Sequence, residues 1–118
     1  MNPKDYRPQE WVEGFPVAIT VCGMDGTVLE MNSKSELTFA KDGGKKLVGT
    51  DVRACHPSVA RAKLEELLAT GKTNAYTIEK GGVRKLIYQA PWYKDGKMAG
   101  LVELSLEIPE HMPHFKRS

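Results

Sequence analysis

The chain has 118 residues, and 17 lysine or arginine residues against 15 aspartate or glutamate residues give a formal net charge of +2. This length suits one domain with a single core and excludes a large multi-domain enzyme. The apolar stretches fall far short of the roughly 20 residues that a membrane-spanning helix needs, and the start MNPKDYRP lacks the apolar region of a signal peptide. Two cysteines, Cys22 and Cys55, are too few for a disulfide framework. We therefore expect a cytoplasmic protein with reduced thiols.

Basic residues gather only in the tail 114–118 (HFKRS), whereas a nucleic-acid-binding domain of this size usually shows a basic stripe. We expect neither nucleic acid nor a membrane as partner. The chain divides into an N-terminal helical cap at 1–14, one domain at 15–108 and a tail at 109–118. Pro8 to Glu13 fit a short helix that Gly14 ends, and Trp11 and Phe15 would anchor this helix on an apolar surface.

The first part of the domain predicts a hairpin followed by a short helix. Apolar residues alternate along 17–22, an Asp25-Gly26 turn follows, and 27–31 form the returning strand. Asn32 is placed to cap the short helix with its side-chain oxygen, and Ser33 and Glu36 have the spacing of a capping box. Glycines at 43 and 44 end this helix, and 45–54 are expected to be irregular.

The clearest helix is predicted over 57–69. Proline suits the first helical position because its missing N–H would have no partner there. Ala60, Leu64, Leu67 and Leu68 share one face at helical spacing, and Gly71 lies where a left-handed cap is common. This face predicts a helix that packs on a sheet.

Three further strands are predicted at 73–79, 83–93 and 98–108, joined by turns at Gly81-Gly82 and Asp95-Gly96. Hairpins at both ends of the domain require antiparallel pairing, and the helices in the middle of the chain must cover one face of the sheet. The fold class is therefore α+β. Alternate apolar positions on the last two strands suggest one shared face: 86, 88, 90 and 92, with 102, 104, 106 and 108.

Three segments in this order resemble a PAS domain over about residues 15–108. They are 25–32 (DGTVLEMN), similar to the first PAS hairpin, 47–52 (LVGTDV), similar to the approach to the long helix, and 93–103 (YKDGKMAGLVE), similar to the last hairpin. The resemblance implies a five-stranded antiparallel sheet with helices wrapped around a small pocket, and a sensory role. Members of the family bind haem, flavin, small metabolites or nothing, so the resemblance implies a module type and leaves the ligand open.

Within the family, Cys55-His56-Pro57 resembles a subgroup with a Cys-His-Pro signature at the start of the long helix. The last strand departs from the pattern, since it ends Leu-Glu-Ile-Pro where PAS domains with a downstream effector often show Asp-Ile-Thr. With no output domain before residue 118, we expect a signalling partner in a separate protein and a homodimer formed through 1–14 and the outer sheet face.

The predicted ligand site is a small, mostly apolar cavity between the long helix and the sheet. Cys55 and His56 are expected at its rim, where the helix dipole favours a thiolate and a neutral imidazole. Tyr88 would supply a polar contact. Leu64, Leu68 and Leu104 would supply the apolar lining. The alternatives are purely structural roles: His56 caps the helix, Cys55 packs as a small hydrophobe, and the tyrosines are ordinary core residues.

Three functions remain open at this point: a small-molecule sensor, a ligand-free homodimerisation or scaffold domain, and a haem-based gas or redox sensor with His56 as the iron ligand. The cofactor is expected to be absent or a small organic ligand, with haem as the further alternative; no other metal site is predicted. Phosphate loops, a Gly-x-Ser-x-Gly motif and catalytically spaced carboxylates are not found in the sequence. We therefore expect no enzymatic activity.

Overall fold

One hairpin and a three-stranded meander build the sheet of this protein, for which the computed structural model describes residues 1–4, 8–53 and 58–118. The first hairpin joins β1 (Ala18–Gly23) to β2 (Val28–Met31) through the Asp25-Gly26 turn. Gly26 has a φ of 85°, and the Asp25 carboxylate accepts a hydrogen bond of 2.9 Å from the backbone N–H of Thr27. The Asp-Gly pair thus folds the chain back on itself, as its sequence predicts.

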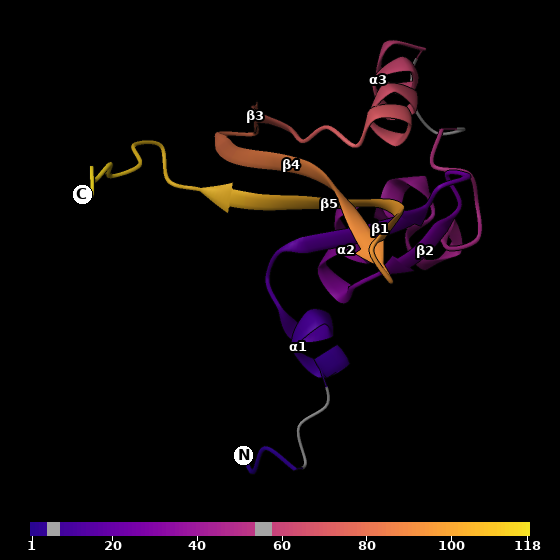
Figure 1. Ribbon diagram of the computed structural model, residues 1–118. Helices are drawn as coiled ribbons and strands as arrows, with labels where there is room; N and C mark the ends of the chain where they lie inside the picture. The colour runs from indigo at the N-terminus through magenta and orange to yellow at the C-terminus, as the bar shows by residue number, and fades with distance from the viewer. Residues whose placement is uncertain (5–7, 54–57) are drawn as a thin grey trace.

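The second half of the sheet is a meander of β3 (Asn74–Lys80), β4 (Val83–Lys94) and β5 (Lys97–Ile108). Asp95 and Gly96 both have positive φ, 52° and 77°, which is the signature of a type I′ hairpin turn. The five strands lie in the order β2-β1-β5-β4-β3, and every neighbouring pair is antiparallel. The predicted α+β fold with a five-stranded antiparallel sheet is confirmed (Figure 1).

The helices are α1 (Pro8–Gly14), α2 (Ser33–Thr38) and α3 (Ser58–Thr70), with short 3₁₀ turns η1 (Ala40–Asp42) and η2 (Gly44–Leu47). The predicted long helix is confirmed over its described part. Gly71 ends it with a φ of 70°, and its N–H donates to the Leu67 carbonyl at 2.8 Å. No helix among the described residues is long and apolar enough to cross a membrane. In Figure 1, α1 and the N-terminus extend away from the sheet, as does the segment after β5.

The cap of α2 differs in part from the prediction. Asn32 is the N-cap, as expected, and its Oδ1 accepts a 3.0 Å hydrogen bond from the Ser35 N–H. The prediction that Ser33 and Glu36 form a capping box is wrong, because Ser33 is already the first helical residue. Its hydroxyl instead donates to the carboxylate of Glu13 in α1, at 2.9 Å.

The core lies between α3 and the sheet. Leu64, Leu67 and Leu68 are buried there with Cys22 of β1 and Leu101 of β5. Because side chains alternate along a strand, the strand positions in register with Cys22 and Leu101 form the inner face, which α3 covers. The inner positions of the three central strands are Ala18, Thr20 and Cys22, then Leu101, Glu103 and Ser105, then Ile87, Gln89 and Pro91.

The apolar stripe predicted on the last two strands does share one face, since Tyr88 pairs with Leu104 and Leu86 pairs with Leu106. It is, however, the opposite face from the one that packs against α3. We call it the outer apolar face; it comprises Ile19, Leu86, Tyr88, Val102, Leu104 and Leu106. Leu104, which is expected to line the cavity under the long helix, therefore lies on the other face of the sheet. A sheet with two apolar faces cannot be oriented from alternation alone.

Candidate functional site

A row of polar side chains crosses the inner face of the sheet beside α3. Thr20, Glu103 and Gln89 stand side by side on β1, β5 and β4, and Asn74 pairs with Gln89 from β3. The Asn74 amide donates to Gln89 Oε1 at 2.8 Å, and Gln89 Nε2 donates to Glu103 Oε2 at 3.2 Å. This row is ordered by its own hydrogen bonds and ends on a carboxylate.

A groove of about 400 Å³ opens above this row. We call it the α3 groove: one wall is α3, the floor is Gln89 and Glu103, and the far wall is β3. The remaining lining residues are Val59, Ala60, Lys63, Leu64, Asn74 and Tyr76. Its volume falls within the range of roughly 300–1,000 Å³ that is common for small-molecule sites.

A second hollow of about 100 Å³ lies on the same face under α2 and the loop that follows it. We call it the α2 pocket; it is lined by Thr20 and Glu103 from the sheet and by apolar side chains that include Met31, Phe39 and Leu47. A gap of about 20 Å³ between the two hollows is lined by Thr20, Val52, Leu64, Gln89 and Glu103, among others. Glu103 therefore lines both hollows and the gap between them.

Two titratable side chains near Glu103, those of Tyr76 and Cys22, have raised pKa values. Burial raises the pKa of the Tyr76 phenol, and the negative charge of Glu103 raises it further. Burial also raises the pKa of the Cys22 thiol, with smaller contributions from nearby carboxylates that include Glu103. Cys22 is consequently a buried, protonated thiol that packs in the core, and it is not suited to act as a nucleophile.

The structure places the predicted site residues in three different settings. Leu64 lines the α3 groove, and Leu68 is packed in the adjacent core. Tyr88 and Leu104 lie on the outer apolar face, where Tyr88 is 39% exposed, so their predicted place in the cavity under the long helix is wrong. Cys55 and His56 lie outside the described residues, and their place at the rim stays a prediction.

Sequence reasoning missed Glu103, Gln89 and Asn74 as site residues. The available signal was their phase: Glu103 lies between Val102 and Leu104, so it points to the face opposite those two side chains. A glutamate in the middle of a strand, flanked by apolar residues, indicates a polar position on the face opposite its neighbours. Whether that face is covered can be decided only once the orientation of the strand is known. Among the described residues, no cluster of three histidine, cysteine, aspartate or glutamate side chains is arranged to hold a metal ion.

Asn32 connects the α2 pocket to the N-terminal helix. It is fully buried; its Oδ1 accepts from the backbone N–H groups of Ile19 and Ser35, and its Nδ2 donates to the carbonyls of Val12 and Val17. The hydroxyl of Ser35 is hydrogen-bonded to that of Thr20, at 2.5 Å. Hydrogen bonds thus run from Thr20, which lines the pocket, through Ser35 and Asn32 to Val12 of α1.

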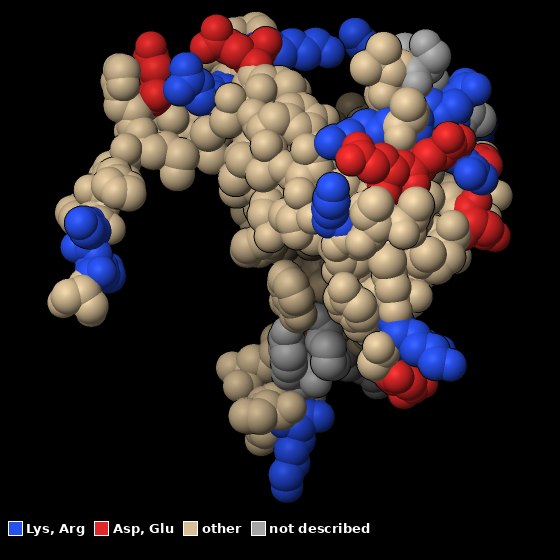
Figure 2. Space-filling view, turned by 45° about the horizontal axis from the view of Figure 1, so that its top comes forward, with Lys and Arg blue, Asp and Glu red and all other residues tan. Residues whose placement is uncertain are grey.

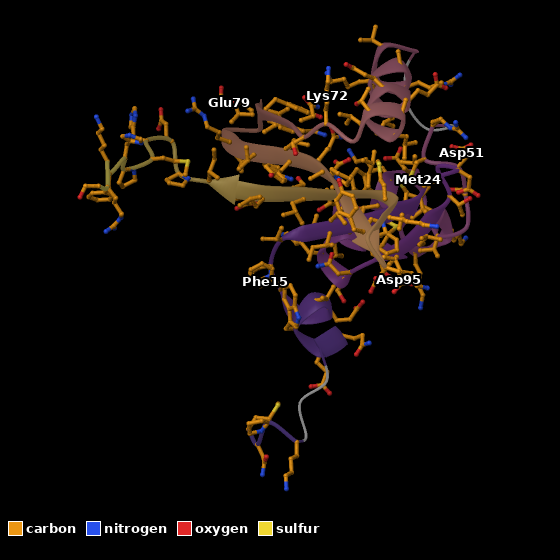
Figure 3. The ribbon with its side chains drawn as sticks, in the orientation of Figure 1. Phe15, Met24, Asp51, Lys72, Glu79 and Asp95 are labelled. Atoms are coloured by element: carbon orange, nitrogen blue, oxygen red, sulfur yellow. The ribbon has the colours of Figure 1, made fainter. Side chains whose placement is uncertain are left out.

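An ion pair fixes the loop at the other end of the α2 pocket. The Arg53 guanidinium donates to both carboxylate oxygens of Asp51, at 3.0 and 2.8 Å, and to the Asp25 carbonyl at 2.8 Å. It therefore ties the loop before α3 to the turn between β1 and β2. Asp51 lies on this loop at the edge of the molecule (Figure 3). The hydrogen bonds from Arg53 lower the pKa of the Asp51 carboxyl to about 2.

Replacing Arg53 by methionine is expected to raise the pKa of Asp51 from about 2 toward its ordinary value of 3.8. The rise should be incomplete, because the backbone N–H of residue 53 still donates to Asp51. Since the carboxyl has a lowered pKa in the folded state, its stabilising effect is present above pH 3.8 and is lost as the pH falls through about 2. Carboxyl-carbon NMR titration measures the shift. Arg84→Met, a matched change on β4, should leave the pKa of Asp51 unchanged.

Charges on the surface are mixed in sign. On the face that Figure 2 shows, lysine and arginine side chains lie next to aspartate and glutamate side chains rather than forming one basic field. This arrangement agrees with the small net charge of +2. It lends no support to binding of an extended polyanion on that face.

Comparison with solved structures shows the PAS fold. The chain resembles the PAS domain of a Colwellia psychrerythraea protein, with 17% identity, a TM-score of 0.61, and 87% of this chain and 95% of that chain covered. It also resembles the PAS domain of nitrogen regulation protein NR(II) from Vibrio parahaemolyticus, with 15% identity, a TM-score of 0.59, and 87% and 99% covered.

A third similar structure is that of the Vibrio cholerae Aer2 receptor, described as a dual PAS-heme oxygen sensor, with 16% identity, a TM-score of 0.59, and 83% and 99% covered. No protein-family model matches the chain, and no curated protein sequence matches it. The fold class is thus that of PAS domains, as the three sequence segments indicate. The predicted Cys-His-Pro signature, at 55–57, lies outside the described residues.

Proposed function

We propose that this protein is a sensory signalling module that binds a small organic molecule on the inner face of its PAS sheet and signals through protein–protein contacts. One observation carries the proposal: the α3 groove combines apolar walls with the ordered polar row of Asn74, Gln89 and Glu103. Small-molecule sites typically have this composition, mostly apolar with a few fixed polar groups. The role is one of binding and not of catalysis.

The structural neighbours give the proposal its second support. They include a dual PAS-heme oxygen sensor, the sensor region of a sensor histidine kinase and a sensory box sensor histidine kinase from Vibrio cholerae. We propose that the present chain reports to a separate protein.

The signal would leave through the N-terminal segment 1–14 and the outer apolar face. Trp11 and Phe15 pack edge to face with ring centroids 5.7 Å apart, yet they stay 49% and 45% exposed. Phe15 lies between α1 and β1 in Figure 3. Partly exposed aromatic and aliphatic side chains of this kind are typical of a contact surface. The hydrogen bonds through Asn32 would link movements of the α2 pocket to α1.

The proposal predicts two results in one native mass spectrum of the purified protein. The first is a mass of two chains, and the second is an additional mass of a small organic molecule that is lost on denaturation. A dimer without any added mass would favour the ligand-free scaffold function instead. Strong Soret absorption of the purified protein would favour the haem sensor, for which His56 is the predicted iron ligand.

The variant Leu104→Asp tests the outer apolar face as the dimer contact. Placing a carboxylate among these apolar side chains should convert the dimer into a monomer while the far-ultraviolet circular dichroism stays unchanged. Leu37→Asp is the matched control, because Leu37 is a 74% exposed leucine on α2, away from this face. A folded Leu104→Asp protein that still runs as a dimer would rule out this contact.

A further inference from the structure

We infer that the α2 pocket is a second ligand site of this protein and that it takes a small uncharged molecule of about the size of one aromatic ring. The inference goes beyond the proposed function, which the α3 groove carries, because it concerns another hollow on the inner face and names the chemical class that fits there. It starts from the lining of the pocket. The apolar side chains of this lining come from β2, from the end of α2, from η2 and from the loop before α3: Val28, Met31, Phe39, Leu47 and Val52.

The loop that closes the pocket is bound to the first hairpin by its backbone. The Val28 N–H donates to the Thr50 carbonyl at 2.8 Å, and the Gly49 N–H donates to the Val28 carbonyl at 2.7 Å. The Val52 N–H donates to the Gly26 carbonyl at 2.8 Å. The walls are therefore held in place by the protein itself, so that a ligand has little of the chain to order when it binds.

The polar side chains of the lining already have partners inside the protein. The hydroxyls of Thr20 and Thr50 are hydrogen-bonded to another hydroxyl and to a backbone carbonyl, respectively. Both carboxylate oxygens of Asp51 accept from Arg53, and Glu103 accepts from a glutamine and has a further interaction within the protein. None of the buried side-chain nitrogen and oxygen atoms in the described residues lacks a hydrogen-bond partner. The pocket thus presents no unmet polar group that a ligand would have to satisfy.

Charge of either sign on the ligand is disfavoured. Three carboxylates, those of Asp42, Asp51 and Glu103, belong to the lining, so an anion would lie against charges of its own sign. A cation would leave water for a mainly apolar pocket, in which Asp51 and Glu103 already serve groups of the protein. Asp42 is exposed on η1, where water weakens its attraction for a cation. An uncharged apolar molecule meets neither cost.

The size and the lining of the pocket favour a single aromatic ring. Apolar cavities of about 150 Å³ bind benzene, and the volume of the α2 pocket, about 100 Å³, is of the same order. The pocket is therefore too small for two fused rings. Phe39 supplies an aromatic ring and Met31 a thioether sulfur, and both groups make favourable contacts with aromatic rings.

Toluene, benzylamine and benzoate share a phenyl ring and differ in charge, so each is titrated into the dialysed full chain and followed by amide NMR shifts. We expect toluene to bind at least about tenfold more tightly than either charged probe, because moving a charge from water into an apolar pocket is costly. The shifts should centre on β2, Phe39 and residues 47–52. Binding of either charged probe as tight as that of toluene, or toluene shifts that centre on the α3 groove, would overturn the inference.

The variant Leu47→Trp should abolish toluene binding, because the larger indole would fill the pocket from η2. Leu37→Trp is the matched control: it is the same change at an exposed leucine of α2 outside the lining, and it should leave toluene binding intact.

Should Leu47→Trp fail to fold, Phe39→Ala provides a second test. Removing this ring enlarges the pocket, so naphthalene should bind at least about tenfold more tightly to the variant than to the parent protein. Toluene binding that survives in a folded Leu47→Trp protein, or naphthalene binding that Phe39→Ala leaves unchanged, contradicts the inference.

The outcomes separate this inference from the proposed function. If the native mass spectrum shows a bound molecule but toluene does not bind in the α2 pocket, the inference fails and the proposed function stands. If toluene binds there and Leu47→Trp abolishes its binding, the inference stands, even where the native mass spectrum shows no added mass and the scaffold function is favoured.

Discussion

Replacing Asn32 by alanine is expected to lower the free energy of unfolding by about 3 kcal/mol, combining the loss of a helix cap with newly unsatisfied buried groups. The side chain is fully buried and satisfies two backbone N–H groups and two carbonyls from three parts of the chain. Alanine supplies neither donor nor acceptor, so four main-chain groups lose their partner at once. Urea unfolding followed by circular dichroism measures the change.

Two further variants test whether Asn32 does more than cap α2. Ser33→Ala, at the next residue, removes only one exposed hydrogen bond to Glu13 and should change stability by less than about 0.5 kcal/mol. Asn32→Asp keeps the acceptor for Ser35 and Ile19 but replaces the donor to Val12 and Val17 with a second oxygen. It should therefore be destabilised despite an intact cap. Equal stability of the aspartate variant and the parent protein would show that only capping matters.

Replacing Gly100 by alanine is expected to cost at least about 3 kcal/mol, or to prevent folding, because an added methyl group would overlap main-chain atoms. Gly100 sits on β5 opposite Gly23 of β1, with a φ of 152° that other residues rarely adopt. A Cβ there would overlap the Cys22 carbonyl, which already accepts a 3.0 Å hydrogen bond from the Trp92 indole. Backbone atoms cannot move aside without opening the β1–β5 pairing.

Gly82→Ala is the matched control for this substitution. Gly82 also has a positive φ, 79°, but nothing lies within 4 Å of the position that its Cβ would take. The control should cost only the backbone strain of about 1 kcal/mol. Thermal unfolding of the two variants compares them directly. Similar losses at both positions would mean that strain, and not the overlap with β1, limits position 100.

Much of the fold could be predicted from the sequence because its turn and helix signals are strong. Asp-Gly pairs at 25–26 and 95–96 specify tight turns by supplying residues that tolerate positive φ, and both turns form as expected. The long helix follows from leucines at helical spacing, which the core then buries. These signals are local, so they can be interpreted without knowledge of tertiary contacts.

Predicting the candidate site required knowing which face of β5 points toward α3, and local sequence signals do not determine this. Both faces of β5 are covered or partly covered, so the alternation of Val102, Leu104 and Leu106 with Glu103 fits either orientation of the strand. Choosing the more apolar side as the inner face put Leu104 in the cavity and Glu103 outside it. The polar row of Asn74, Gln89 and Glu103 also joins three strands, and such a row becomes visible only when their register is known.

The pairing of β1 with β5 has a consequence for the synthesis of this chain. The first hairpin reaches the rest of the sheet only through β5, whose residues 97–108 leave the ribosome after all the other strands. Closing this pair joins residues about 80 positions apart, such as Gly23 and Gly100, whereas each hairpin closes within a few residues. The nascent chain must therefore hold β1 and β2 without their main partner until β5 has been synthesised. A ribosome-stalled chain that ends before β5 should remain open to proteases, and one that exposes all of β5 should be protected.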